Sequence, residues 1–93
     1  MEQERITAAA IKVANKSLST YPMVLTAFRH CDIFELMRAM NIREKFYYCT
    51  QGFWTSNDRF VDRIEAKKIA VAANQLIVPL NETYNELYSE DVW

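Results

Sequence analysis

Glycine, proline and cysteine are all scarce in this sequence of 93 residues, which contains one Gly, two Pro and two Cys. A single Gly excludes glycine-rich phosphate loops and the dinucleotide-binding fingerprint, because both need several glycines at fixed spacing. Cys31 and Cys49 are too few and too far apart for a zinc cluster, and we expect them to be free thiols in a reducing cytoplasm. The sequence therefore predicts neither a bound metal nor a cofactor.

A long apolar run and an excess of positive charge are also missing. No stretch approaches the roughly 20 apolar residues of a membrane span, so no membrane partner is expected. The polar start, residues 1–5, is unlike a secretory signal. Lys and Arg number 11 against 12 Asp and Glu, which gives a net charge of −1 and a pI near 5.8. Because phosphate contacts dominate nucleic-acid affinity, this balance argues against extended nucleic acid as a partner but allows a small local anion site.

What the sequence does have is ordinary globular composition, with 51% hydrophobic and 25% charged residues. Its length predicts a single domain spanning residues 1–93. A chain this short buries only roughly 60–65% of its unfolded surface. We therefore expect modest stability, supplemented by self-association into a homo-oligomer.

Several segments are predicted to form strands. Residues 6–13 fit both a helical stripe and a strand alternation, but the turn-like residues after them and the extended residues 18–21 favour a strand–turn–strand hairpin. Residues 45–55 are dense in aromatic and β-branched side chains, as strands are, and Gly52 indicates a bulge or a close backbone approach. Residues 76–80, interrupted by a proline, suit an edge strand.

Two segments carry helical spacing. In residues 32–40 the apolar positions recur at i, i+3, i+4 and i+7, and Asn41 is a suitable end. In residues 62–74, Asp62 is placed to cap the helix, with Glu65 three residues later in a capping-box arrangement. Together these segments predict an α+β fold with antiparallel strands and two main helices.

Cationic residues stand at the start of both predicted helices. Arg29 and His30 precede the first helix, and Arg59 and Arg63 flank the start of the second. Unpaired N–H groups at helix starts attract anions, and the planar arginine fork binds phosphate through two parallel hydrogen bonds. The alternative is structural: His30 caps its helix while the arginines are solvated or paired with acids. If the four side chains converge, they form one anion-binding site.

Aromatic and acidic residues could complete such a site. Most of the large side chains are expected in the core, but Tyr48 and Trp54 are the two expected to be partly available for stacking on a nucleobase. The acidic end of the chain carries Trp93, which we expect to dock on its own domain or on a neighbouring subunit. Docking would fix Glu90 or Asp91 where it can accept hydrogen bonds from a ribose or from an arginine.

No catalytic signature is present. The sequence has no nucleophile elbow and no Ser-His-Asp order. An acid–base pair of His30 with Glu90 or Asp91 stays open. We expect a binding protein in preference to an enzyme, since nothing in the sequence supplies a recognised nucleophile or cofactor site.

The sequence resembles a family of small proteins encoded by tailed phages, over nearly the whole chain. The central stretch from Gly52 to Ala66 is the most specific part of the resemblance, and Asp58 stands where the family outline usually has Gly, which suggests a different turn at that point. The matching segments are Ala9-Ala10-Ile11-Lys12, Arg29-His30-Cys31-Asp32, Gln51-Gly52-Phe53, Thr55-Ser56, Arg59-Phe60-Val61-Asp62-Arg63, Glu65-Ala66, Ile69-Ala70, Gln75 and Leu87-Tyr88-Ser89-Glu90-Asp91-Val92-Trp93.

The resemblance implies a setting, that of a small accessory protein acting in the host bacterial cytoplasm, often against host defence. Many such defences signal through cyclic nucleotides or NAD-derived molecules. We therefore expect a non-enzymatic protein that sequesters a phosphate-bearing nucleotide signal, as a sponge does. The alternatives are a protein–protein inhibitor of a host defence enzyme, built on Trp, Tyr and Arg contacts, and a small nucleotide-processing enzyme that uses His30.

Overall fold

The ambiguous first segment folds as a strand and not as a helix. The computed structural model describes residues 3–16, 23–77 and 86–93, apart from the side chains of Glu44 and Glu90. Strand β1 (Ile6–Asn15) pairs antiparallel with β2 (Met23–Ala27), so the first segment is a strand as predicted and pairs with the next strand along the chain. Strand β2 follows Pro22, however, and the predicted strand 18–21 lies outside the described residues.

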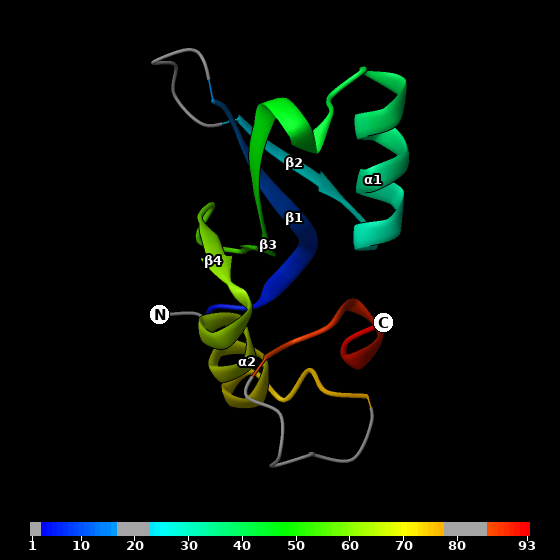
Figure 1. Ribbon diagram of the computed structural model, residues 1–93. Coiled ribbons are helices and arrows are strands. Elements are labelled where there is room, and N and C mark those ends of the chain that lie inside the picture. Colours follow the sequence, from blue (N-terminus) through cyan, green and yellow to red (C-terminus); the bar gives the residue numbers. More distant parts are fainter. Residues whose placement is uncertain (1–2, 17–22, 78–85) are drawn as a thin grey trace.

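Four antiparallel strands form one sheet in the order β2-β1-β3-β4 (Figure 1). Strand β3 (Tyr47–Thr55) follows a short 3₁₀ helix, η1 (Glu44–Phe46), which takes up the start of the predicted strand 45–55. The short β4 (Phe60–Asp62) was not predicted as a strand, because a three-residue pattern is too brief to recognise. The α+β fold with antiparallel strands and two helices is as predicted.

Each helix follows an edge strand of the sheet. Helix α1 (His30–Ala39) follows β2, and helix α2 (Arg63–Ala72) follows β4 without a linking residue. Asp62 caps α2 by accepting a hydrogen bond at 2.8 Å from the N–H of Glu65, as predicted. Helix α1 starts two residues earlier than predicted, since Arg29 occupies the N-cap position and Asp32 accepts its backbone N–H at 3.2 Å. Asn41, with a φ of 60°, follows α1 as the expected left-handed end residue.

The strand register places the two helix starts at the same level of the sheet. Ala27, the last residue of β2, faces Ala9; Ala9 faces Phe53; and Phe53 faces Val61, the residue before the last of β4. Strands β2 and β4, at opposite edges of the sheet, therefore end at nearly the same level across the strands. Both helices then cross the same face, which brings their N-termini toward each other.

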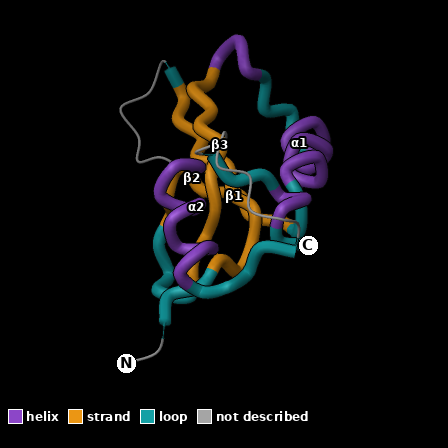
Figure 2. The backbone as a smooth tube through the Cα atoms, turned by 90° about the horizontal axis from the view of Figure 1, so that it is seen from below, coloured by secondary structure: helices purple, strands orange, loops and turns teal. Residues whose placement is uncertain are grey.

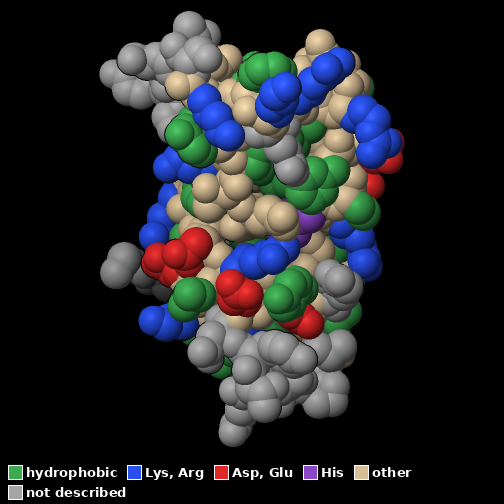
Figure 3. Space-filling model, viewed as in Figure 1, with side chains coloured by type: hydrophobic (Ala, Val, Ile, Leu, Met, Phe, Trp, Pro, Cys, Tyr) green, Lys and Arg blue, Asp and Glu red, His purple; other side chains and the backbone are tan. Residues whose placement is uncertain are grey.

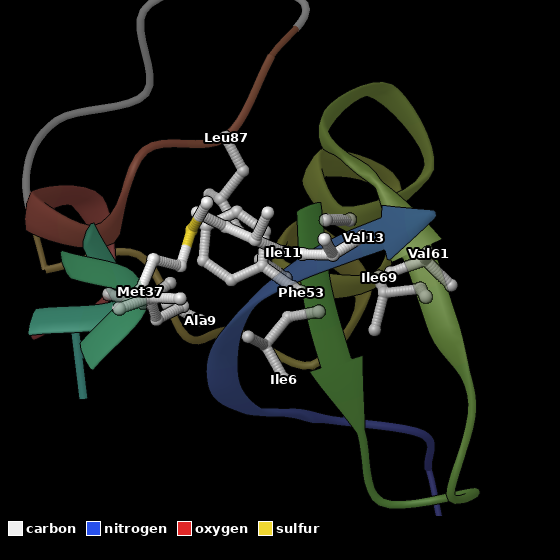
Figure 4. Packing of buried hydrophobic residues seen from close by; sticks show 13 residues of the cluster. Ile6, Ala9, Ile11, Val13, Met37, Phe53, Val61, Ile69 and Leu87 are labelled. Atoms are coloured by element: carbon white, nitrogen blue, oxygen red, sulfur yellow. The ribbon is translucent and has the colours of Figure 1, made fainter. Parts of the chain in front are cut away.

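One face of the sheet carries the core. Figure 4 shows side chains of β1 and β3 meeting Met37 from α1, Ile69 from α2 and Leu87 from the C-terminal segment. The buried residues of this inner face alternate along each strand, as period-two packing requires. They are Ala9, Ile11 and Val13 of β1 and Phe53 of β3, packed against Ile33 and Met37 of α1 and Ala66, Ile69 and Ala70 of α2.

The C-terminal segment docks on its own chain. Leu87 is fully buried, and its N–H donates to the carbonyl of Arg63 at 3.0 Å. A second 3₁₀ helix, η2 (Ser89–Asp91), follows, and the ring of Trp93 stacks on Phe28 with centroids 5.4 Å apart. The expected docking of Trp93 therefore occurs within one chain, beside the first turn of α1 (Figure 2).

Two further predictions concern the edge strand at residues 76–80 and the turn at Asp58. Leu76 and Ile77 of the predicted edge strand 76–80 are not in a strand, and the remaining three residues lie outside the described part. Asp58 has a φ of 56°, in the left-handed region that glycine enters without steric cost, so a glycine at this position would fit the same turn. Among the described residues, no helix is long and apolar enough to cross a membrane.

Candidate functional site

Residues from both helix starts and from the C-terminal segment enclose a cavity of about 180 Å³. We call this cavity the arginine hollow; it is lined by Arg29, His30, Cys31, Arg63, Tyr88 and Ser89. Three of the four predicted cationic residues therefore meet in one place. Figure 3 shows the histidine side chain, in purple, between blue Lys and Arg side chains on this face of the molecule.

His30 is buried in the wall of the hollow, with 8% of its surface exposed, and both of its ring nitrogens have hydrogen-bond partners. Its Nε2 lies 2.7 Å from the carbonyl oxygen of Gly52, which can only accept, so Nε2 carries a proton. Its Nδ1 lies 2.8 Å from the Oγ of Ser89. In the neutral tautomer Nδ1 therefore accepts a hydrogen bond from the Ser89 hydroxyl. The edge of the ring also packs on Phe53, at 5.0 Å between centroids.

Arg63 combines a positive charge with an unsatisfied donor. Its Nη2 donates to Oε1 of Gln51 at 2.5 Å, and its guanidinium lies over the ring of Tyr88 at 4.7 Å. Its Nε is buried and has no hydrogen-bond partner among the described residues. Because an unpaired buried donor is costly, a bound acceptor at this atom would be favourable.

Arg29 is held in place from two sides. Its Nη2 donates to the main-chain oxygen of Trp93 at 2.6 Å, and its guanidinium carbon lies 5.8 Å from the ring centre of Phe28. The docked end of the chain therefore positions Arg29 at the rim of the hollow. Sequence reasoning anticipated the docking of Trp93 but not this consequence, since the contact joins residues 64 positions apart.

Arg59 does not join the hollow. It binds the carboxylate of Glu4 through Nε and Nη2, both at 2.8 Å, and it also donates to Glu65 at 3.0 Å. Thr55 donates to the same carboxylate at 2.6 Å. This network joins the segment before β1 to the β3–β4 turn and to the first turn of α2. The structural alternative considered for the arginines therefore describes the surroundings of Arg59.

The Arg59 guanidinium, helped by the Thr55 hydroxyl, lowers the pKa of Glu4 from 4.5 to about 2. A carboxyl with a lowered pKa stabilises the fold above its unfolded pKa, and this contribution is lost as the pH falls from about 4.5 toward 2. We therefore expect Glu4→Gln to be less stable than the wild type at pH 7 and the difference to shrink over that acid range. Urea denaturation at a series of pH values measures it.

Glu35→Gln is the matched control for this prediction. Glu35 pairs only with Arg38 among the described residues, at 3.3 Å, and both side chains are more than 70% exposed. Exposed pairs of this kind contribute little. A constant difference between Glu4→Gln and the wild type across the acid range would contradict the prediction.

The predicted stacking residues lie on the other face of the sheet. Tyr48 and Trp54 alternate with the inward-facing Phe53, and Tyr48 is 64% exposed with Nζ of Lys16 lying 5.0 Å from its ring centre. The aromatic residue at the hollow is instead Tyr88, which sequence reasoning did not select. Its position directly after the buried Leu87 was the available signal, because a buried anchor fixes the residues that follow it.

Of the two acidic residues predicted for the site, the structure describes the side chain of Asp91 but not that of Glu90. Asp91 accepts the N–H of Tyr88 at 2.9 Å, which closes the turn of η2, and it does not line the hollow. Glu90 lies in η2, but its side chain is outside the described part of the structure. Ser89, which sequence reasoning did not select, lines the hollow and places its Oγ 2.8 Å from Nδ1 of His30.

The described residues contain no group of three His, Cys, Asp or Glu side chains able to hold a metal ion. Cys31 and Cys49 form no disulfide. The residues that line the hollow supply two guanidinium groups, an imidazole, a thiol, a hydroxyl and a phenol ring.

The comparison with protein families gives a match over almost the entire chain. The family described as Phage T4 y16D protein matches residues 5–93, which include every residue of the arginine hollow. Comparisons with curated proteins and with solved structures find no match.

Proposed function

Since the chain belongs to the phage T4 y16D family, we propose that this phage protein binds and withholds a phosphate-bearing nucleotide signal of its host, such as a cyclic nucleotide or an NAD-derived molecule. The observation that carries the proposal is the meeting of Arg29, His30 and Arg63 in one hollow. The protein then acts by lowering the free concentration of the signal. Such a role needs affinity and no chemical step.

The electrostatics of the hollow favour an anion. It lies at the N-termini of α1 and α2, where the helix dipoles attract negative charge. Two guanidinium groups add a full charge each and present several N–H donors to an oxygen-rich ligand. The neighbouring carboxylate of Asp91 is directed to a backbone N–H of its own turn.

The size of the hollow favours a compact anionic group. Its volume of about 180 Å³ is below the roughly 300–1,000 Å³ of ordinary ligand pockets, so it accepts a phosphate group and not a whole nucleotide. The buried Nε of Arg63 offers a donor that no described residue uses. A phosphate supplies acceptor oxygens in several directions, which suits donors that arrive from three different segments.

Calorimetric titration against a panel of cyclic di- and trinucleotides and NAD-derived cyclic products tests the proposal. We expect one class to bind, and Arg63→Met to bind it roughly 10- to 100-fold more weakly, since hydrogen bonds to charged groups contribute about 1.5–3 kcal/mol. Arg59→Met is the matched control, because it removes the same charge outside the hollow. We expect it to retain wild-type affinity.

Two results would contradict the proposal. One is the absence of binding across the panel by a protein that is folded by circular dichroism. The other is an equal loss of affinity in Arg63→Met and Arg59→Met, which would indicate a general charge effect.

A specific contact favours a second candidate, a small nucleotide-processing enzyme. Ser89 Oγ and His30 Nδ1, at 2.8 Å, have the separation of a nucleophile and its general base, and the carbonyl of Gly52 orients the imidazole. Chromatography of the ligand released by denaturing the complex separates the two candidates. Intact ligand supports withholding, and a cleaved ligand supports processing.

A further inference from the structure

A second hollow lies against the arginine hollow and shares Arg63 with it. It has a volume of about 390 Å³ and is lined by Cys49, Thr50, Gln51, Asp62, Arg63, Ile64 and Glu86. We call it the acceptor groove, because apart from Arg63 its charged side chains are carboxylates. The guanidinium of Arg63 contacts both sites, since it donates to Gln51 in the groove and lies over Tyr88 in the hollow.

The chemistry of the two sites differs. The arginine hollow offers donors and positive charge, whereas the acceptor groove is lined by the carboxylate residues Asp62 and Glu86 and by Thr50 and Gln51, whose amide oxygen already accepts from Arg63. Carboxylates repel phosphate but accept hydrogen bonds from hydroxyl groups. A second phosphate is therefore disfavoured in the groove, while a neutral group rich in hydroxyls is favoured there.

From this arrangement we propose that the ligand is a sugar phosphate unit, with its phosphate in the arginine hollow and its sugar hydroxyls on the carboxylates of the acceptor groove. The inference rests on the proposed function and specifies which part of the nucleotide is recognised. The two volumes agree with it, because the hollow alone is too small for a nucleotide whereas the groove lies within the usual range of ligand pockets.

Glu86 is the residue that most directly tests the sugar contact. It is exposed, and its described contact is weak, a hydrogen bond at 3.4 Å from the hydroxyl of Tyr88. Replacing it therefore leaves the fold intact. Asp62 is unsuitable for this purpose, since it caps α2.

The experiment is an NMR titration of the whole protein with inorganic phosphate and with ribose 5-phosphate. We expect ribose 5-phosphate to bind about tenfold more tightly than phosphate, as hydrogen bonds to a carboxylate would give. In Glu86→Gln the tenfold advantage of ribose 5-phosphate over phosphate should fall to about threefold or less. The affinity for phosphate itself should stay equal or rise, because a negative charge near Arg63 is removed. Glu35→Gln, an exposed acid of α1 outside both sites, should behave as the wild type.

The outcomes separate this inference from the proposed function. Equal affinities for phosphate and ribose 5-phosphate, with Arg63→Met weakening both, would overturn the sugar assignment and leave the anion site standing. An unchanged tenfold advantage in Glu86→Gln would also overturn it. Failure of both probes to bind would overturn the anion site and, with it, this inference.

Discussion

Gly52→Ala is expected to destabilise the protein by about 3 kcal/mol, a large part of the stability of a small domain. A Cβ atom at this position would lie 2.2 Å from the carbonyl oxygen of Val61 and 2.6 Å from the ring of Phe60. The nearer atom is backbone, so a change of rotamer cannot relieve the clash. Strand β4 would have to move away from β3, which would break their pairing at Gly52 and Phe53.

Thermal melting followed by circular dichroism measures this effect. For a domain of this size, about 3 kcal/mol corresponds to a fall in Tm of roughly 12–24 °C. Thr50→Ala, on the same strand and facing the same side of the sheet, is the control and should shift Tm by only a few degrees. If Gly52→Ala had the same Tm as the wild type, β4 would not lie where the structure places it.

Leu87→Ala should cost about 2–5 kcal/mol and should also abolish ligand binding. Leu87 is fully buried against the sheet, and it anchors the segment that supplies Tyr88 and Ser89 to the arginine hollow. Loss of the anchor leaves a cavity in the core and frees two walls of the site. Urea denaturation measures the stability, and calorimetry with the ligand identified in the panel measures the affinity.

Ile77→Ala is the control for Leu87→Ala, since Ile77 is 64% exposed and its contact with the C-terminal segment is a backbone hydrogen bond to Asp91. We expect a stability change within about 0.5 kcal/mol and unchanged binding. Full ligand affinity in a destabilised but folded Leu87→Ala would indicate that Tyr88 and Ser89 do not form part of the site.

Two buried residues, His30 and Ser89, connect the hollow to the core. His30 is held by a carbonyl on β3 and a hydroxyl in the C-terminal segment, and Arg29 is held by the end of the chain. A site ordered before binding loses less conformational entropy when the ligand arrives. Self-association, predicted from the length of the chain, stays a prediction that analytical ultracentrifugation can test.

Features that depend on neighbours along the chain were predictable from the sequence. The cap of α2 at Asp62, the end of α1 at Asn41 and the strand character of most of residues 45–55 were all predicted and are present. Each is determined by side chains or backbone angles within three or four residues, and the amino-acid sequence specifies these directly.

Features that depend on distant pairing were not predictable in this way. The sequence offers the same kind of side chain at positions 59 and 63, yet Arg59 binds Glu4, 55 residues away, while Arg63 lines the hollow. The choice depends on which residues the antiparallel register brings opposite each other. Neither propensity nor periodicity contains that information.

The amino-acid sequence by itself determined the helices, most of the strands and the presence of cationic residues where two helices begin. Only the tertiary structure decided which of those residues meet, because the hollow forms where the row Ala27, Ala9, Phe53 and Val61 aligns the two edges of the sheet. It also decided that Tyr88 and Ser89 complete the hollow, since burial of Leu87 in the shared core brings the C-terminal segment to the helix starts.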